Sequence, residues 1–161
     1  MQQKQTTNPQ EFTDVLSIPR QGRVLALDPG MKRIGVAVCD ETQSVTRTLP
    51  RIERASWKKL LIAVKDIVKD SDAVGLVIGL PLESDGSESE MSAEARRMAH
   101  SFALSLSIPV VLQDERVTSY EAKGRLWAAG ASIGAARDAV DSEAASIILN
   151  DFITDGRRSI R

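Results

Sequence analysis

The chain contains 161 residues, of which 42% are hydrophobic and 27% are charged, and its formal net charge is −1. This balance is typical of a globular protein, excludes a disordered or membrane-embedded chain, and argues against indiscriminate coating of nucleic acid. No apolar run approaches the ~20 residues of a membrane span, and the polar first 22 residues hold no secretory segment. The single cysteine, Cys39, excludes an internal disulfide, so we expect a cytoplasmic location.

The length suits one domain with an ordinary layered core. We expect this domain over residues 23–154. Residues 1–22 are rich in Gln, Thr and Asn and predict a flexible N-terminal extension. Residues 155–161 form a short basic tail.

Three short strands are expected at the start of the domain. Residues 24–27 and 34–38 are apolar, too short for helices, and separated by a turn that contains Pro29, which predicts a β-hairpin. Residues 44–52 are β-prone and predict a third antiparallel strand, in which Pro50 indicates an edge position.

Helices alternate with strands in the rest of the chain. Ser56 is the expected N-cap of a helix whose apolar residues recur at helical spacing as far as Val68. Residues 73–79 are apolar without alternation, as in a strand that is buried on both faces. A second helix is expected over residues 88–106, and another strand over residues 110–112.

The C-terminal third is expected to be helical. Thr118 and Glu121 form a capping box for a helix that ends at Ala129. Residues 130–137 are small and glycine-containing and predict a mobile loop, and the last helix is expected over residues 138–153. The order of elements predicts an α/β fold with a five-stranded mixed sheet, three antiparallel strands followed by two parallel ones, and helices on both faces.

Acidic residues are expected to converge at one edge of this sheet. Asp28 ends the first strand, and Asp114 with Glu115 ends the fifth. Ligands of such sheets bind beyond the carboxyl ends of the strands. Asp141 lies on the inward stripe of the last helix, four residues before Ala145. We favour Glu115 over Asp114 because its longer side chain reaches further, and Asp114 stays a second candidate ligand.

Carboxylates that are held close together repel unless a cation neutralises them. Hard oxygen ligands without His or Cys select Mg²⁺ or Mn²⁺ rather than zinc. Two such ions about 4 Å apart would activate a water and stabilise the leaving oxygen of a phosphodiester. The pattern therefore predicts phosphodiester hydrolysis, with Asp28, Glu115 and Asp141 as the catalytic acids.

Each acid also has a simpler interpretation. Asp28 with the Pro-Gly pair that follows could mark only a turn. Asp141 could complement the positive end of its helix. Asp114 and Glu115 could each pair with a neighbouring base, as most acids at strand ends do. The case for a site depends on the three positions together.

Four ordered blocks of the chain resemble the YqgF family, also called RuvX-like proteins. The blocks are Asp-Pro-Gly-Met-Lys-Arg-Ile-Gly-Val-Ala at residues 28–37, Gly-Leu-Pro-Leu with Asp-Gly within residues 79–86, Asp-Glu-Arg-Val-Thr-Ser at residues 114–119, and Asp-Ser-Glu-Ala-Ala at residues 141–145. The resemblance covers about residues 23–152 and leaves the N-terminal extension out.

This resemblance implies a ribonuclease H-like fold and a divalent-metal nuclease. Its carboxylates would be Asp28, one acid of the Asp114 and Glu115 pair, and Asp141. The implied partner is nucleic acid, either precursor ribosomal RNA or branched DNA. A resolvase of branched DNA is expected to be a homodimer, because it cuts two strands symmetrically.

Basic residues flank the acidic strand ends. We expect Lys32, Arg33 and Arg116 to contact substrate phosphates, because a guanidinium can engage two oxygens at once. The alternative is that such an arginine pairs with a neighbouring carboxylate and holds it in place.

The leading functional hypothesis is an endonuclease that matures the 5′ end of 16S ribosomal RNA during ribosome biogenesis. A Holliday junction resolvase with the same metal site is its rival. An ATP-binding module of the actin and sugar-kinase type also starts with an Asp-x-Gly hairpin, but it needs two such domains and this chain supplies one. A non-catalytic nucleic-acid-binding factor is the last alternative.

Overall fold

A mixed five-stranded sheet forms the centre of the computed structural model, which describes Phe12, residues 14–116 and residues 133–154, with the backbone alone for 116 and 133–142. The strands lie in the order β3-β2-β1-β4-β5. The first three pair antiparallel, whereas β4 runs parallel to β1 and β5 parallel to β4. Their bounds are β1 (Val24–Pro29), β2 (Arg33–Cys39), β3 (Thr46–Glu53), β4 (Gly75–Leu82) and β5 (Val110–Arg116).

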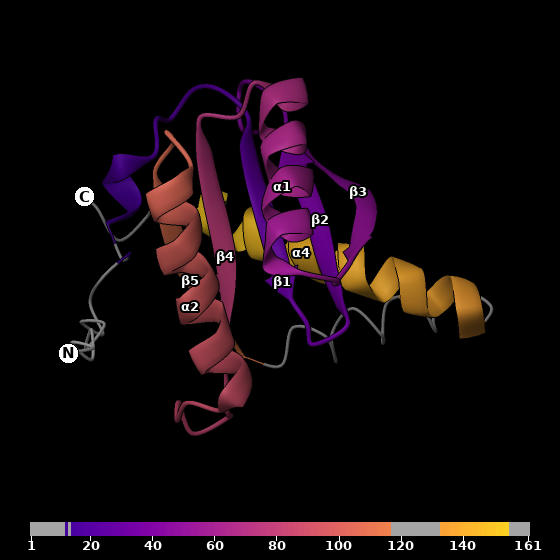
Figure 1. The fold of residues 1–161 in the computed structure, drawn as a ribbon. Coiled ribbons are helices and arrows are strands. Elements are labelled where there is room, and N and C mark those ends of the chain that lie inside the picture. The colour runs from indigo at the N-terminus through magenta and orange to yellow at the C-terminus, as the bar shows by residue number, and fades with distance from the viewer. Residues whose placement is uncertain (1–11, 13, 117–132, 155–161) are drawn as a thin grey trace.

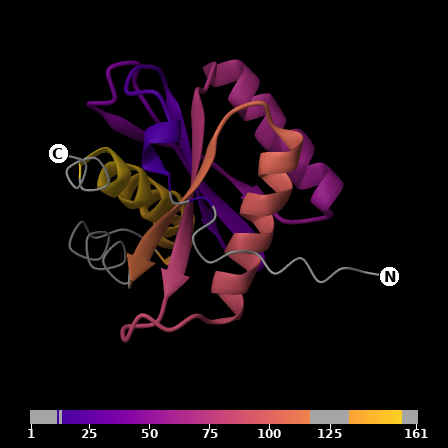
Figure 2. The same cartoon turned by 90° about the vertical axis from the view of Figure 1, so that its left-hand side faces the viewer.

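Helices cover both faces of the sheet, which makes three layers. α1 (Trp57–Ser71) and α2 (Glu90–Ser105) lie in front of the sheet in Figure 1, and α4 (Ile133–Thr154) crosses behind the strands. Seen from the side in Figure 2, the two groups of helices stand on opposite sides of the sheet. Within the described residues, no helix combines the length and the apolarity that crossing a membrane requires.

Serine caps set the starts of the two helices on the first face. The Ser56 hydroxyl accepts a hydrogen bond from the Lys59 amide at the start of α1, as predicted. At the start of α2, Ser89 and Ser92 form a reciprocal capping box. These caps satisfy amides that would otherwise lack an acceptor in the first turn.

The strands divide the core into two clusters, because successive side chains of a strand point to opposite faces. Leu25 and Leu27 of β1 belong to the cluster beneath α1 and α2, which we call the α1/α2 face. Val24 and Ala26 belong to the cluster beneath α4, which we call the α4 face. This alternation fixes the face on which each later residue of the strand lies.

The predicted α/β fold is confirmed, and the differences lie at element ends. β5 extends beyond the predicted 110–112 as far as Arg116, so Asp114 and Glu115 lie within the strand. α4 begins at Ile133, and the mobile loop predicted for residues 130–137 is therefore wrong over its last five residues. This stretch contains two alanines and an arginine, which are good helix formers. The helix predicted between Thr118 and Ala129 lies outside the described residues.

The described part of residues 1–22 departs from the flexible extension that we expected. Ile18 is only 2% exposed and joins the cluster on the α4 face. Gln43 holds the same segment, because its amide nitrogen donates to the carbonyls of Pro19 and Gly22 at 2.8 and 2.9 Å. The Leu112 amide of β5 donates to the Phe12 carbonyl at 2.8 Å, which covers part of a sheet edge. The polar composition of this segment therefore did not indicate that Ile18 belongs to the core.

Replacing Ile18 with alanine tests this packing. We expect Ile18→Ala to lower the free energy of unfolding by about 2 to 4 kcal/mol, because the cavity would open against Gly75 in the core. Leu16→Ala is the matched control two residues away: Leu16 is 61% exposed, and its truncation should cost less than about 0.5 kcal/mol. Urea denaturation of the three proteins measures both values, and equal stabilities would contradict the packing.

Candidate active site at the carboxyl edge of the sheet

Asp28 lies at the edge of the sheet where the parallel strands end, which we call the carboxyl edge. It pairs with Gly35 of β2, one residue before the end of β1. Because Ala26 lies on the α4 face, Asp28, two residues further, lies on that face as well. Its side chain is half-buried.

Glu115 shares this face, and Asp114 does not. Val111 of β5 belongs to the cluster beneath α4, and Glu115 follows it by four residues in the same strand. Leu112 belongs to the opposite cluster, so Asp114 lies on the α1/α2 face, where it is exposed. Glu115 is only 8% exposed, and a buried carboxylate is costly unless it is hydrogen-bonded, paired or bound to a metal. The alternation of side chains along β5 thus shows that Glu115, and not Asp114, lies on the same face as Asp28, which the sequence alone could not decide.

Helix α4 approaches the sheet closely beside these two acids. Gly79 of β4 pairs with Gln113 of β5, two residues before Glu115, and a Cβ on it would collide with the Ile148 side chain of α4. The Thr46 and Ser146 hydroxyls, 2.9 Å apart, join the same helix to β3. Asp141 lies in α4, seven residues before Ile148, and its side chain is outside the described part of the structure.

Two of the three predicted basic residues, Lys32 and Arg33, lie beside Asp28 on the β2 and β3 side. Lys32 is exposed in the hairpin turn. The Arg33 guanidinium lies 4.0 Å from the Glu53 carboxylate, which Arg51 also contacts at 3.1 Å. Arg51 is not among the basic residues predicted to contact substrate. The backbone of Arg116 ends β5, and nothing is described of its side chain.

A second arginine supports the hairpin turn from the α1/α2 face. Arg54 donates to the Gly30 carbonyl at 3.1 Å, and its other terminal nitrogen contacts the Glu94 carboxylate of α2. The Arg54 amide donates to the Lys32 carbonyl at 2.9 Å. No local pattern marks this pair, because 40 residues separate Arg54 from Glu94.

The chemistry of the two acids on the α4 face fits a hard divalent cation. Both donors are carboxylates, and roughly 10 Å separates the backbones of β1 and β5, two strand spacings apart. Among the described side chains, no group of three or more His, Cys, Asp and Glu is placed to hold a metal ion. The third carboxylate of the prediction is Asp141, whose side chain lies beyond that search.

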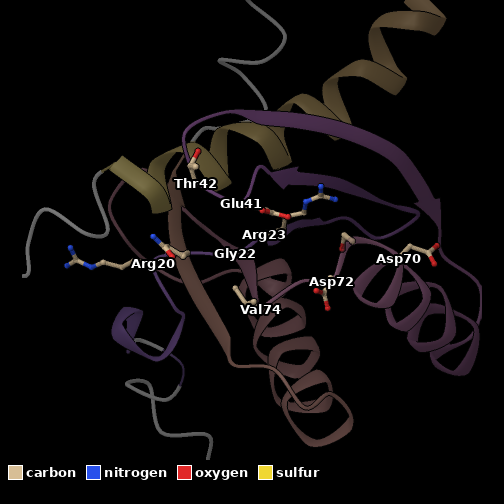
Figure 3. A pocket seen from close by; sticks show the side chains of 10 residues that line it. Arg20, Gly22, Arg23, Glu41, Thr42, Asp70, Asp72 and Val74 are labelled. Atoms are coloured by element: carbon tan, nitrogen blue, oxygen red, sulfur yellow. The ribbon is translucent and has the colours of Figure 1, made fainter.

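A cavity of about 780 Å³ lies at the opposite edge of the sheet, near the starts of β1 and β4. Figure 3 shows its lining of charged side chains of both signs: Arg20, Arg23, Glu41, Asp70 and Asp72. The predicted acids are absent from this lining. The cavity therefore plays no part in the chemistry of the carboxyl edge.

The electrostatics of Glu94 give a pH-dependent prediction. Hydrogen bonds from Arg54 and then from Arg97 hold the pKa of Glu94 below its ordinary value of 4.5. A carboxyl group with a lowered pKa stabilises the fold above its unfolded pKa, and this contribution is lost as pH falls through the folded pKa. We expect Glu94→Gln to cost about 1 to 2 kcal/mol at pH 7 and progressively less below pH 4.5.

Urea denaturation of wild type and Glu94→Gln at pH 7 and at about pH 3 measures this difference. The control is Glu88→Gln, which removes a more exposed partner of Arg96. A cost of Glu94→Gln that is the same at both pH values would contradict the ionic link.

Proteins of similar sequence indicate the family to which this chain belongs. A protein of Anaeromyxobacter dehalogenans named "Putative pre-16S rRNA nuclease" is 38% identical over 131 residues, which cover 81% of this chain and 96% of that protein. A protein of the same name from a Synechococcus species is 35% identical over 137 residues, covering 85% of this chain and 92% of the relative.

Solved structures that align with this chain share little of its sequence. RuvC of T. thermophilus in complex with a Holliday junction aligns with a TM-score of 0.46 and 12% identity, over 76% of this chain and 91% of that one. The Fowlpox virus resolvase complexed with Holliday junction DNA gives 0.47 and 10%, over 86% and 99%.

The strand order and the helices on both faces are those of the ribonuclease H-like fold that the family resemblance implied. The family model described as "RuvX: Holliday junction resolvase" matches residues 22–155. The chain therefore belongs to the RuvX family.

Proposed function

We propose that the chain is an endonuclease that hydrolyses phosphodiester bonds at the carboxyl edge of its sheet, with precursor 16S ribosomal RNA as its substrate. The observation that carries the proposal is that Asp28 of β1 and Glu115 of β5 lie on one face of the sheet, on which α4 packs closely against Gly79 of the intervening strand β4. Membership of the RuvX family supports the nuclease class, and the names of the relatives support the RNA substrate.

In this proposal Asp28, Glu115 and Asp141 are the catalytic acids and would hold two Mg²⁺ or Mn²⁺ ions. A bound divalent cation supplies a more acidic water and stabilises the leaving oxygen of the cleaved ester. Burial of Glu115 lowers the effective dielectric constant around it, which strengthens its attraction for a cation. Asp114 has no ligand role here, because it lies on the other face.

The basic residues orient the substrate in the same proposal. Lys32 and Arg33 lie on the β2 side of Asp28, and Arg116 ends the strand that carries Glu115. Arg33 and Arg51 share the Glu53 carboxylate, which keeps two guanidinium groups side by side. Such a pair can bind successive phosphates of one strand. We place the activity in the cytoplasm, where a precursor ribosomal RNA would be met.

Resolution of four-way DNA junctions is the second candidate function. The description of the matching family model favours it. The same acids would cut DNA, and symmetric cutting of two strands would require a homodimer. Substrate preference separates the two candidates.

Cleavage assays with variants of the acids test the proposed site. We expect Asp28→Asn and Glu115→Gln to lower the rate of cleavage by at least roughly 100-fold, because loss of a mere outer-shell partner of a metal already costs 10 to 100-fold. Asp114→Asn is the matched control from the adjacent position and should keep the wild-type rate within a fewfold. The substrates are a 5′-extended 16S ribosomal RNA precursor and a four-way DNA junction, each with Mg²⁺, Mn²⁺ or EDTA.

Cleavage of the RNA alone would support the leading function, and preferential cleavage of the junction would support the second. Cleavage that persists in EDTA would contradict the metal site. Loss of cleavage activity in Asp114→Asn, together with full activity in Glu115→Gln, would contradict the assignment of these acids by strand face. If folded wild-type protein cut neither substrate with any metal, a binding role would replace the proposed activity.

A further inference from the structure

We propose that Arg54 and Glu94 form a positioning pair that fixes the hairpin turn after Asp28 against helix α2, and so sets the place of the Asp28 carboxylate. The inference rests on the proposed function, because it assigns a role in the same site. Neither residue is expected to touch substrate, since both act from the α1/α2 face, behind the acids. The contacts of Arg54, Glu94 and Ser92 carry the argument.

Arg54 holds the turn at two backbone positions. Its side chain donates to the Gly30 carbonyl at 3.1 Å, two residues after Asp28, and its amide donates to the Lys32 carbonyl at 2.9 Å. The turn itself is tight, because a Cβ on Gly30 would collide with the Arg33 carbonyl. A tight turn that is bound at both ends has little freedom to shift, so the direction in which Asp28 leaves β1 is set by these bonds.

Glu94 connects Arg54 to the body of α2. One of its oxygens accepts from Arg54, and the other accepts from Arg97 at 2.7 Å. The side chains of Arg54 and Glu94 are only 21% and 17% exposed, so water screens their attraction less than it does for a surface pair. Arg97 is exposed and does not reach the turn, which makes it a suitable control.

The first turns of α2 also hold the strand next to Glu115. The fully buried Ser92 hydroxyl donates to the Pro81 carbonyl at the end of β4. Pro81 pairs with Glu115 in the sheet. Ser92 and Glu94 are two residues apart on one helix. Ser92 contacts the end of β4, the strand that pairs with β5, and Glu94 reaches the turn after β1 through Arg54. α2 therefore acts as a brace that fixes the spacing between Asp28 and Glu115.

Arginine is required at position 54 for a geometric reason. Its two terminal nitrogens point to two different acceptors, the Gly30 carbonyl and the Glu94 carboxylate. The single ammonium of lysine cannot reproduce this planar fork. A displacement of about 1 Å in a reacting group can cost roughly 100-fold in rate. Loss of the pair should therefore slow the chemical step and leave substrate affinity nearly unchanged.

The test compares Arg54→Lys and Glu94→Gln with Arg97→Gln and wild type. Single-turnover cleavage is measured with saturating protein in excess over the RNA precursor and with Mn²⁺, and the dissociation constant of the RNA is measured separately in Ca²⁺. We expect the two pair variants to lose about 10 to 100-fold in rate, while their affinities stay within about threefold. Arg97→Gln should resemble wild type in both. The double variant should lose no more than the slower single variant, because the two residues act as one unit.

A second measurement does not require activity. Hydrogen exchange of the backbone amides in residues 30–34 and 54 should be faster in both pair variants than in Arg97→Gln. Faster exchange in a protein whose wild type cuts no nucleic acid would support the brace and overturn the proposed function. Wild-type exchange with full cleavage in Arg54→Lys would overturn the brace and keep the function. If Arg54→Lys lost RNA affinity as much as rate, the brace would also be overturned, because Arg54 would then be a substrate contact.

Discussion

The parallel register of β1, β4 and β5 is the constraint on which the rest of the site depends. Leu27 is level with Ile78, and Ile78 is level with Leu112, so the strands leave the core in step. Their last residues then project beyond the same edge of the sheet. Because side chains alternate between faces, the register also determines which acid of the fifth strand can meet Asp28. A shift of β5 by one residue would place Asp114, instead of Glu115, on the same face of the sheet as Asp28.

Close packing of α4 is the second constraint. Gly79 leaves the space that the Ile148 side chain fills, and small or apolar residues of the same helix are buried on the sheet. The helix that carries Asp141 is thereby held against the face on which Asp28 and Glu115 lie. On the opposite face, α2 is tied to the ends of β1 and β4 through Arg54, Glu94 and Ser92. One face of the sheet presents the acids, and the other face supports them.

Local patterns predicted the parts of the molecule that local physics determines. The hairpin around Pro29 and the edge strand with Pro50 follow from short apolar runs and their breakers, and both appear as expected. The cap at Ser56 follows from helix chemistry. Ile18 could not be predicted, because the few apolar residues near it, such as Val15 and Leu16, show no sustained helix or strand periodicity. Its burial depends on the space above Gly75, which only the folded sheet creates.

The residue types of the candidate site could be proposed from the sequence, whereas their placement on the faces of the sheet could not. The acids at strand ends were visible in the sequence, but the choice between Asp114 and Glu115 depended on strand faces, which an unalternating apolar strand does not reveal. The link between Arg54 and Glu94 joins residues 40 positions apart and leaves no trace in either segment. Long-range polar contacts of this kind emerge only from the packed structure.

Asp28 and Glu115 on the α4 face are proposed above all to form a binding site for a hard divalent cation. Anomalous diffraction from crystals soaked in Mn²⁺ tests it most directly. We expect a manganese peak about 2.1 Å from carboxylate oxygens of both residues. A peak beside Asp114 on the opposite face, or no bound manganese near Asp28 in crystals with this strand register, would contradict the claim.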